Sequence, residues 1–291
     1  MGVSAELGSS QRITTRKYAG SLGAEVEGVD LATNFSDGVM TQIRQALLDH
    51  LVLFFPDQHL TPEQQIAFGR RWGELYIHPL VKGMDEYPAM LELKKTPENK
   101  KNAGGHWHSD QMYSDQPAMA TMLYAKVIPS AGGDTMFTNQ YLAYDTLSPG
   151  MQRLLQDLRA VSYGDHVKGH EGKSRVDYYK ENMSLQTRDP GDRKIISSHP
   201  LVRTHPETGR KSLYIGSHVQ HFEDMTEEES RPLIDFLMAH STRPELTCRY
   251  RWKQNALAIW DNRCTQHNAV NDYPTETRIM HRITLCGDTP Y

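Results

Sequence analysis

A series of short apolar or alternating segments begins near Leu75, continues almost to the end of the chain, and constrains the fold more than any other feature. Turn residues separate each segment from the next. The segments read MLEL, ATMLYAKV, DTMF, SLYIG, LTCRYRW, ALAIW and RIMHRITLC. Short strands with turn signals between them are typical of a β-sandwich or a β-barrel. The sequence therefore predicts a β-rich core from this point on.

The N-terminal third mixes helices with buried strands. An apolar spacing that repeats every three to four residues predicts a helix over about 38–50. The continuous apolar run LVLFF, residues 51–55, predicts a strand buried on both faces. Thr61 is followed by proline and then by Gln64, which together form a capping-box signature for a helix that ends near Trp72.

Two further helices and one long polar segment interrupt the β-rich part. Helices are expected over 151–158, after Ser148-Pro149, and over 226–238, which Thr226 opens. Residues 167–197 are polar, charged and poor in periodicity, so they are predicted to form a long surface loop or lid. Loops of such length inside a compact domain are usually functional or disordered.

Composition favours one soluble globular domain over residues 1–291, with residues 1–12 expected to be disordered. The net charge is -4 and no basic run is present, which argues against a nucleic-acid partner. No apolar stretch reaches about 18 residues, so no membrane span is expected. Cys248, Cys264 and Cys286 are odd in number and widely spaced. They predict free thiols in a reducing compartment, and cytoplasm is the expected location.

A cluster of potential metal ligands lies between Gly104 and Asp110, where the sequence reads GGHWHSD. On a strand, residues i and i+2 point to the same side, so His108 and Asp110 can reach one point in space. An imidazole and a carboxylate form a ligand pair that suits a first-row divalent metal. The best candidate for a third ligand is His267, which follows the apolar segment ALAIW. Two histidines and one carboxylate with open positions form the facial triad of non-haem Fe(II) oxygenases.

The H-x-D pair is a weak signal when it stands alone. The chain has 14 histidines, so accidental pairs are expected. His106 shares the expected strand face with His108, and an H-x-H-x-D cluster of three ligands is an alternative arrangement. The surrounding motifs have to decide between these interpretations.

The segment RIMHRITLC places two arginines on one face of a predicted strand. Arg278, Met280 and Arg282 alternate with His281, which takes the opposite face and is interpreted as structural. Two cations on an apolar face are costly unless they are paired with anions, and a guanidinium suits a carboxylate. The alternative is a structural salt bridge with some of the 36 acidic residues.

Four motifs in this order resemble the TauD/TfdA family of 2-oxoglutarate-dependent dioxygenases. They are WHSD at 107–110, GGDT at 132–135, WDNRCTQH at 260–267 and RIMHR at 278–282. The early segments GAEVEGVDL and LFFPDQHLTPEQQIAFGRRWG also look like the opening of that family. The resemblance covers the chain from about residue 13 to its end.

The resemblance implies a fold and a set of residue roles. The implied fold is a β-rich α+β architecture with a double-stranded β-helix, also called a cupin-like jelly roll, and flanking helices. The implied iron ligands are His108, Asp110 and His267. Thr135 and Arg278 would hold the distal carboxylate of 2-oxoglutarate, and Arg282 would contact an anionic substrate group or share the co-substrate carboxylate.

The implied activity is hydroxylation of a C–H bond in a small anionic substrate: a carboxylate, a sulfonate or a sulfate ester. The reaction would use Fe(II), 2-oxoglutarate and O2, and it would release succinate and CO2. Hydroxylation of a carbon that bears O, S or N would allow cleavage of that bond. By analogy with the family, the protein is expected to be a homo-oligomer, either a dimer or a tetramer.

The substrate side of the expected site departs from taurine-type enzymes. Gly104-Gly105 and Val81 stand where those enzymes carry polar residues, which argues against taurine. The expected substrate-binding residues are His78, His106, Tyr214, His218 and Arg282.

Two alternative functions share the same ligands. A hydrolase or isomerase with zinc or manganese in this site would leave Thr135 and Arg278 without a role. A non-catalytic binding module would predict damaged metal ligands, and none of the three is damaged.

Overall fold

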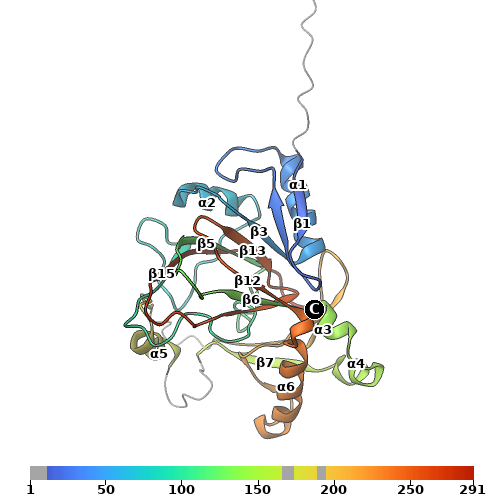
Figure 1. Ribbon diagram of the computed structural model, residues 1–291. Helices are drawn as coiled ribbons and strands as arrows, with labels where there is room; N and C mark the ends of the chain where they lie inside the picture. Colours follow the sequence, from blue (N-terminus) through green and yellow to red (C-terminus); the bar gives the residue numbers. More distant parts are fainter. Residues whose placement is uncertain (1–11, 166–173, 189–194) are drawn as a thin grey trace, which may run out of the picture.

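The computed structural model describes residues 12–165, 174–188 and 195–291. Within these ranges the chain is β-rich, with four sheets and a smaller number of helices (Figure 1). The strands are β1 Thr14–Lys17, β2 Ala24–Glu27, β3 Val52–Phe55, β4 Met90–Lys95, β5 Ala120–Val127, β6 Thr135–Asn139, β7 Arg159–Tyr163, β8 Ile196–Pro200, β9 Val202–Thr204, β10 Lys211–Leu213, β11 Val219–Phe222, β12 Thr247–Tyr250, β13 Leu257–Asp261, β14 Thr265–Ala269 and β15 Arg278–Thr284. The expectation of a β-rich core is confirmed.

The largest sheet has seven strands in the order β1-β2-β3-β13-β5-β15-β4. Its pairs are antiparallel apart from β2 with β3. Strand β15, which carries both predicted arginines, lies between β5 and the edge strand β4. This position places the two arginines against the side chains of β4.

Helices α1 (Asp37–His50) and α2 (Pro62–Arg70) cover one face of this sheet (Figure 1). Leu53 and Phe55 of β3 belong to the apolar cluster on the helix side. Val52 and Phe54 belong to the cluster on the opposite side. Both faces are therefore covered, which explains why the run LVLFF shows no alternation and confirms the predicted buried strand.

Helix α2 begins as its sequence predicts. The Thr61 side chain accepts a hydrogen bond from the backbone N–H of Gln64, and the Gln64 side chain accepts one from the N–H of Thr61. This reciprocal pair satisfies two backbone donors that the first helical turn leaves open. Pro62 follows at the first helical position, where its missing N–H costs nothing.

A three-stranded sheet, β12-β6-β14, packs across the other face of the large sheet. The rings of Phe54 and Tyr250 stack with their centroids 3.9 Å apart, and Phe137 lies beside Trp260 at 5.4 Å. These aromatic side chains fill the space between the two sheets. The candidate site residues of β14, β6 and β15 lie at the border of this layer.

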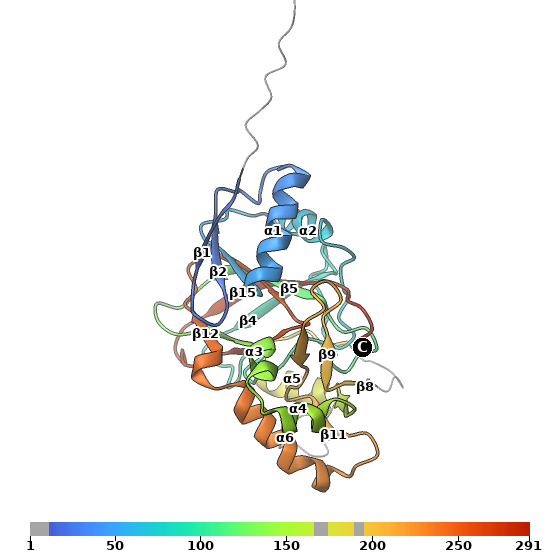
Figure 2. The same cartoon turned by 90° about the vertical axis from the view of Figure 1, so that its right-hand side faces the viewer.

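A second lobe completes the molecule (Figure 2). It contains the sheets β11-β7-β8 and β10-β9 and an apolar cluster of its own. The helices of this part are α3 Gln140–Asp145, α4 Pro149–Leu155, α6 Glu227–Ser241 and the 3-10 turn Pro244–Leu246. Helix α5 Arg175–Asn182 packs instead against Leu80, Val81 and Leu91. Helix α6 packs on β11 and α3.

Three expectations need correction. The segment 167–197 is not a plain loop, because helix α5 forms within it and strand β8 starts at Ile196; its parts 166–173 and 189–194 lie outside the described residues. Helix α6 extends to Ser241 instead of ending near 238, and α4 ends earlier, at Leu155. The expected disorder of residues 1–12 stays a prediction, because residues 1–11 lie outside the described residues.

The three cysteines are free thiols, as predicted. Across the described residues, no helix combines the length and the apolar character that a bilayer crossing requires.

Candidate active site

The segment that carries His108 is not the strand that its sequence suggested. Residues 101–117 form turns, and the only strand-like contact of this segment is an isolated bridge between His108 and His267. The two residues exchange backbone hydrogen bonds of 3.1 and 2.8 Å. His108 and Asp110 still meet, because a turn continues from this bridge; Gln111, just after it, has a φ of 61°. The bridge joins the segment to β14, which carries His267.

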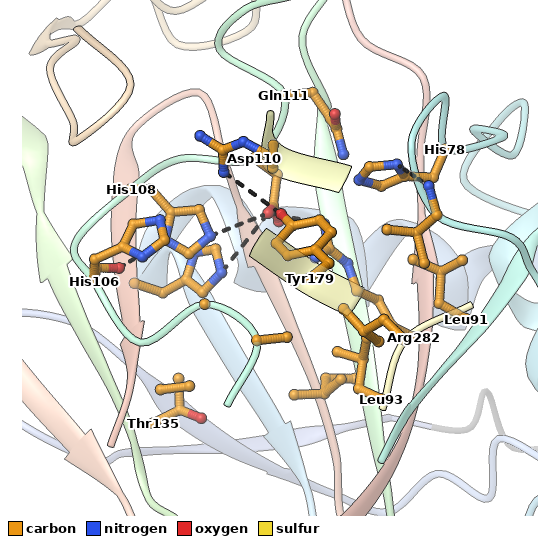
Figure 3. A pocket seen from close by; sticks show the side chains of 18 of the residues that line it. His78, Leu91, Leu93, His106, His108, Asp110, Gln111, Thr135, Tyr179 and Arg282 are labelled. Atoms are coloured by element: carbon orange, nitrogen blue, oxygen red, sulfur yellow. Dashed lines mark hydrogen bonds and ion pairs between the residues drawn. The ribbon is translucent and has the colours of Figure 1, made fainter. Parts of the chain in front are cut away.

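Three potential metal ligands converge in the buried interior of the site. Asp110 Oδ1 lies 3.6 Å from His108 Nε2 and 3.8 Å from His267 Nε2 (Figure 3). One ligand atom from each residue lies within 4.8 Å of the other two. His106 is not part of this group, although its ring centroid lies 4.8 Å from that of His108. The geometry thus favours the trio over the H-x-H-x-D alternative.

The tautomer of His108 suits a metal ligand. His108 Nδ1 lies 2.7 Å from the carbonyl oxygen of His106, so Nδ1 carries the hydrogen and donates it. The lone pair of Nε2 then faces Asp110. A backbone carbonyl commonly fixes a metal-binding imidazole in this way. Two imidazole nitrogens and one carboxylate oxygen also form a donor set that suits Fe(II).

A chain of hydrogen bonds supports Asp110. Its Oδ2 accepts a bond of 2.7 Å from the hydroxyl of Thr121, and that hydroxyl accepts one of 3.0 Å from the Asn262 side chain. Arg282 Nη2 lies 2.8 Å from Oδ1. Burial by itself would raise the pKa of Asp110, but Arg282 and His267 outweigh it and hold that pKa well below its usual range. Asp110 is therefore an anion that can accept a cation.

His267 is held neutral. Burial, followed by the neighbouring His108, lowers the pKa of His267 well below its ordinary value. The interior position explains this shift, because a buried imidazolium loses its hydration. A neutral imidazole is the form that binds metals.

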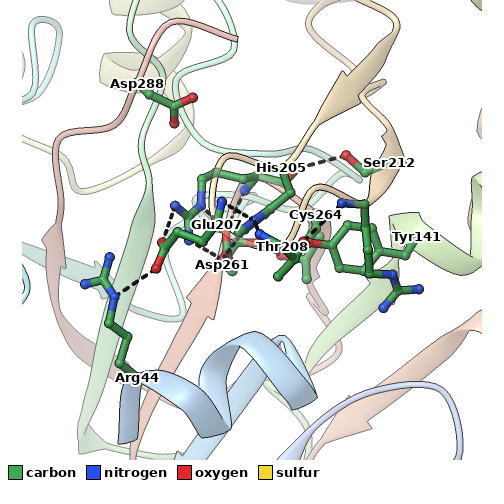
Figure 4. A network of polar contacts seen from close by, with 12 residues as sticks. Arg44, Tyr141, His205, Glu207, Thr208, Ser212, Asp261, Cys264 and Asp288 are labelled. Carbon is green, nitrogen blue, oxygen red and sulfur yellow. Dashed lines mark hydrogen bonds and ion pairs between the residues drawn. The ribbon is translucent and has the colours of Figure 1, made fainter. Parts of the chain in front are cut away.

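A buried ion-pair network positions the turn before β14 (Figure 4). Arg263 donates to both carboxylate oxygens of Asp261, at 2.9 and 2.7 Å, and His205 lies 3.1 Å from the same carboxylate. Arg263 also contacts Glu207 at 2.7 Å. Cys264 lies in this cluster, but Arg263 forms a two-pronged pair with both oxygens of Asp261 and His205 Nε2 contacts the same carboxylate, so the cluster is better suited to a structural role than to a metal. It fixes the turn that leads to His267.

Thr135 and Arg278 line one end of the same cavity. Thr135 starts β6 and pairs with Ala269 of β14, two residues after His267. Its hydroxyl accepts a hydrogen bond of 2.9 Å from the indole N–H of Trp252. Arg278 is buried, and its Nε and Nη2 atoms have no hydrogen-bond partner among the described residues. An anion that reaches this end would satisfy a guanidinium that the described residues leave open.

The other predicted substrate residues divide into two groups. His78, His106, His218 and Arg282 line the cavity, as expected. His78 lies with Arg282 on the side of Asp110 opposite His106 and His108 (Figure 3). Tyr214 is absent from the cavity lining, and its ring packs under the Arg203 guanidinium at 5.0 Å. The structure therefore does not bring Tyr214 to the cavity, because its ring packs in the core of the second lobe.

His78 is a hydrogen-bond donor with a fixed tautomer. Its Nδ1 accepts hydrogen bonds from the backbone N–H groups of Leu80 and Val81, at 3.0 and 3.1 Å. Nε2 must then carry the hydrogen. Burial, followed by the nearby Arg282, lowers the pKa of His78 to about 3.

Some cavity residues were missed by the sequence reasoning. They are Leu91 and Leu93 of β4, Arg175 and Tyr179 of α5, and Gln111 and Tyr113 of the turn segment. The alternation in MLELKK could have identified Leu91 and Leu93. Arg175 donates to His218 Nδ1 at 3.2 Å, a contact between residues far apart in sequence that no local pattern indicates.

Known proteins and one family model are similar to this chain over almost its whole length. The family model described as "Taurine catabolism dioxygenase TauD, TfdA family" matches residues 14–284. The chain is 34% identical to an alkylsulfatase of Acinetobacter baylyi, over 96% of this chain and 86% of that protein. It is also 34% identical to an alpha-ketoglutarate-dependent sulfate ester dioxygenase of Pseudomonas putida, over 94% of this chain and 89% of the relative.

Solved structures agree with these matches. A taurine dioxygenase from Burkholderia xenovorans superposes with a TM-score of 0.80 at 34% identity, covering 96% of this chain and 90% of that one. The protein AAD-2, in complex with Mn(II) and N-oxalylglycine, superposes with a TM-score of 0.77 at 29% identity, covering 96% and 98%.

Proposed function

Because the chain belongs to the TauD, TfdA family, we propose that it is an Fe(II)- and 2-oxoglutarate-dependent dioxygenase that hydroxylates a C–H bond of a small anionic substrate. One observation carries the proposal: the ligand trio of His108, Asp110 and His267 shares a cavity with the Thr135–Arg278 pair. A metal-dependent hydrolase would need the trio but not the pair. The same chain belongs to a β-rich fold that we propose to be a double-stranded β-helix, formed by a single domain.

Each residue has a distinct part in this proposal. His108, Asp110 and His267 would hold Fe(II), and Thr135 with Arg278 would hold the distal carboxylate of 2-oxoglutarate. When bound, Fe(II) and 2-oxoglutarate supply the O2-dependent oxidation, in which 2-oxoglutarate becomes succinate and CO2. The protein positions the reactants and excludes water from the site.

Thr135 can donate as well as accept. A hydroxyl has one hydrogen and two lone pairs, and Trp252 already donates to one of those lone pairs. The hydroxyl hydrogen is therefore available for a carboxylate. Arg278 adds a charged donor at the same end of the cavity, and the two together select an anionic terminus.

Arg282 and His78 support an anionic substrate. His78 offers a neutral Nε2–H donor, because its Nδ1 is engaged by two backbone amides. Arg282 offers a guanidinium beside Asp110. A sulfate ester, a sulfonate or a carboxylate would fit these donors, and relatives at 30–34% identity are named for such substrates. If the hydroxylated carbon carries oxygen, sulfur or nitrogen, the product can break that bond.

The lid, the cellular location and the assembly are further parts of the proposal. We place the lid at α5, since Arg175 and Tyr179 line the cavity from this helix. Limited proteolysis around α5, with and without ligand, tests this placement, and an unchanged cutting pattern would contradict it. We also propose a cytoplasmic enzyme that assembles as a dimer or a tetramer, which sedimentation analysis of the purified protein checks.

The decisive experiment is anaerobic addition of Fe(II) and 2-oxoglutarate to the purified protein. We expect a weak visible charge-transfer band, and we expect Arg278→Ala to lose it at the same 2-oxoglutarate concentration. A well-folded protein without the band would contradict the proposal. Succinate release over a panel of sulfate esters, sulfonates and carboxylates then identifies the substrate class.

A further inference from the structure

Strand β4 carries a buried lysine, Lys95, for which the proposed reaction has no use so far. Its register with β15 pairs Leu91 with Arg282, Leu93 with Met280, and Lys95 with Arg278. Residues directly opposite each other on neighbouring strands point to the same face. Lys95 is therefore on the face of the sheet whose other β4 residues, Leu91 and Leu93, line the central cavity.

No described carboxylate forms an ion pair with Lys95. The side chain is 5% exposed, and Nζ lies 3.3 Å from the carbonyl oxygen of Tyr273 and 4.5 Å from the centroid of its ring. Among the described residues, no carboxylate lies within ion-pair distance of Lys95 or of Arg278. Asp134, the third residue of the nearby GGDT motif, has one oxygen 2.6 Å from Arg249 instead.

Lys95, Tyr273 and Arg278 pack as one layer. Gly133 allows this arrangement: a Cβ at Gly133 would lie 3.1 Å from Arg278 Cδ and 3.3 Å from Tyr273 Cδ1. A second, smaller cavity runs behind this layer, is lined by both Lys95 and Arg278, and has the exposed Lys94 and Lys101 at its edge. Arg278 lines both cavities, together with Leu93, Ala103 and Leu185, so this basic recess lies directly beside the central cavity.

Two buried cations on directly opposed positions repel each other, and burial deprives both of hydration. Asp134 attracts Arg278 at longer range, but among the described residues no carboxylate pairs with Lys95. An anion from outside the chain would relieve both at once. The central cavity ends at Arg278, where the distal carboxylate of the co-substrate is proposed to lie.

We propose that Lys95 is a second cationic group for the distal carboxylate of 2-oxoglutarate, and that with Arg278 it makes the enzyme selective for 2-oxo diacids over 2-oxo monoacids. The inference rests on the proposed function. Lys95 acts through its charge and through Tyr273, which lies beside Arg278. Charges act over longer distances in a buried site than in water, so direct contact with the carboxylate is not required.

Binding measurements on the Mn(II)-loaded protein test this proposal. Isothermal titration compares 2-oxoglutarate with 2-oxobutyrate, which lacks the distal carboxylate. We expect Lys95→Met to weaken 2-oxoglutarate binding roughly tenfold and to leave 2-oxobutyrate binding unchanged. Lys17→Met is the matched control, because Lys17 is an exposed strand lysine on β1 that lines neither cavity, and it should change both affinities less than twofold.

Thermal unfolding of the same proteins without ligand gives a second readout. Lys95→Met should melt at or above the temperature of the unmodified protein, because it removes a buried charge that no described acid offsets. If Lys95→Met does not fold, the same measurements are made on Lys95→Gln, which keeps a donor for the Tyr273 carbonyl.

The outcomes are distinguishable. Unchanged 2-oxoglutarate binding in a folded Lys95 variant overturns the inference and leaves the proposed function intact. Equal weakening of both ligands shows a merely structural role for Lys95 and also overturns it. If the unmodified protein binds neither ligand, the proposed function itself fails, and the inference fails with it.

Discussion

Thr135 illustrates how much of this site depends on single hydrogen bonds. The sequence suggested the residue through the GGDT motif, but it gave no hint of Trp252, which donates to the Thr135 hydroxyl from a distant part of the chain. Trp252 also lies near Arg278, with the guanidinium carbon 5.8 Å from the ring centroid. A buried tryptophan N–H usually has a hydrogen-bond partner, and here that partner is Thr135, which is proposed to bind the co-substrate.

The first prediction concerns this indole. Trp252→Phe keeps the aromatic ring but removes the donor, so the Thr135 hydroxyl is free to turn away from the co-substrate. We expect 2-oxoglutarate to bind the Mn(II)-loaded protein about 3- to 10-fold more weakly, the effect of one neutral hydrogen bond. Calorimetric titration measures the change.

A matched control exists elsewhere in the chain. Trp72 is also buried, and its Nε1 has no hydrogen-bond partner among the described residues. Trp72→Phe should leave the affinity unchanged. Equal losses in both variants would mean that Trp252 contributes only through packing.

The second prediction concerns the hydroxyl behind Asp110. Thr121→Val removes the donor to Asp110 Oδ2 and leaves the Asn262 amide without its acceptor. Groups that orient a ligand typically change metal affinity 10- to 100-fold, so we expect a loss of about that size. Titration with Mn(II) measures it. Thr121→Ser keeps the hydroxyl and should retain most of the affinity for Mn(II). Equal Mn(II) affinities of Thr121→Val and Thr121→Ser would disprove the orienting role of the hydroxyl.

The secondary-structure elements differ in how far neighbouring residues in the sequence determine their conformation. Helix α2 follows its sequence closely, because its capping box and its proline act within one turn. The segment around His108 does not follow its sequence pattern: the alternation suggested a strand, but the chain forms turns anchored by the bridge to His267. The bridge is a long-range contact, so it could not be read from residues 104–110.

A test of local control is the α2 cap. Thr61→Ala removes the side-chain acceptor for the Gln64 N–H, and such caps are worth about 1 kcal/mol. We expect the melting temperature to fall by about 2–4 °C without a change in 2-oxoglutarate affinity. Calorimetry checks the first part and titration the second. Thr61→Ser keeps the oxygen and should melt close to the unmodified protein; a comparable loss there would argue that the methyl group, not the cap, is responsible.

At the scale of the whole molecule, burial of the site links stability to pH. His78 has a pKa of about 3 in the folded protein, whereas an unfolded histidine titrates near 6.5. Between these values the unfolded state binds more protons. The contribution of His78 to stability is therefore complete above about pH 6.5 and is lost progressively as the pH falls toward 3.

This difference predicts the behaviour of one variant. His78→Gln cannot titrate, so the free energy of unfolding should decrease less between pH 7 and pH 4 than in the unmodified protein. Urea unfolding at a series of pH values measures the two slopes. His59→Gln is the control, since His59 is exposed, and it should follow the unmodified curve; parallel curves for His78→Gln would show that His78 titrates normally.

The sequence by itself determined what local chemistry can specify. Short apolar segments and turn residues indicated a β-rich fold, the capping box fixed the start of α2, and the spacing in RIMHRITLC placed Arg278 and Arg282 on one face. Each of these features acts over a few residues, so a single sequence is sufficient to predict it. The ligand trio was also suggested by sequence, with the help of the family motifs.

The tertiary structure decided which distant side chains share one cavity. It brought Trp252 to Thr135, Arg175 to His218 and Lys95 opposite Arg278, and it removed Tyr214 from the cavity lining. The pairing of Lys95 with Arg278 follows from strand order and register, whereas the other contacts depend on how helix α5 and the loops pack on the sheets. Strand order depends on how the whole core packs, and a shift of one residue would turn each side chain to the other face of its sheet. That dependence on global packing is the physical reason why no local pattern could have supplied them.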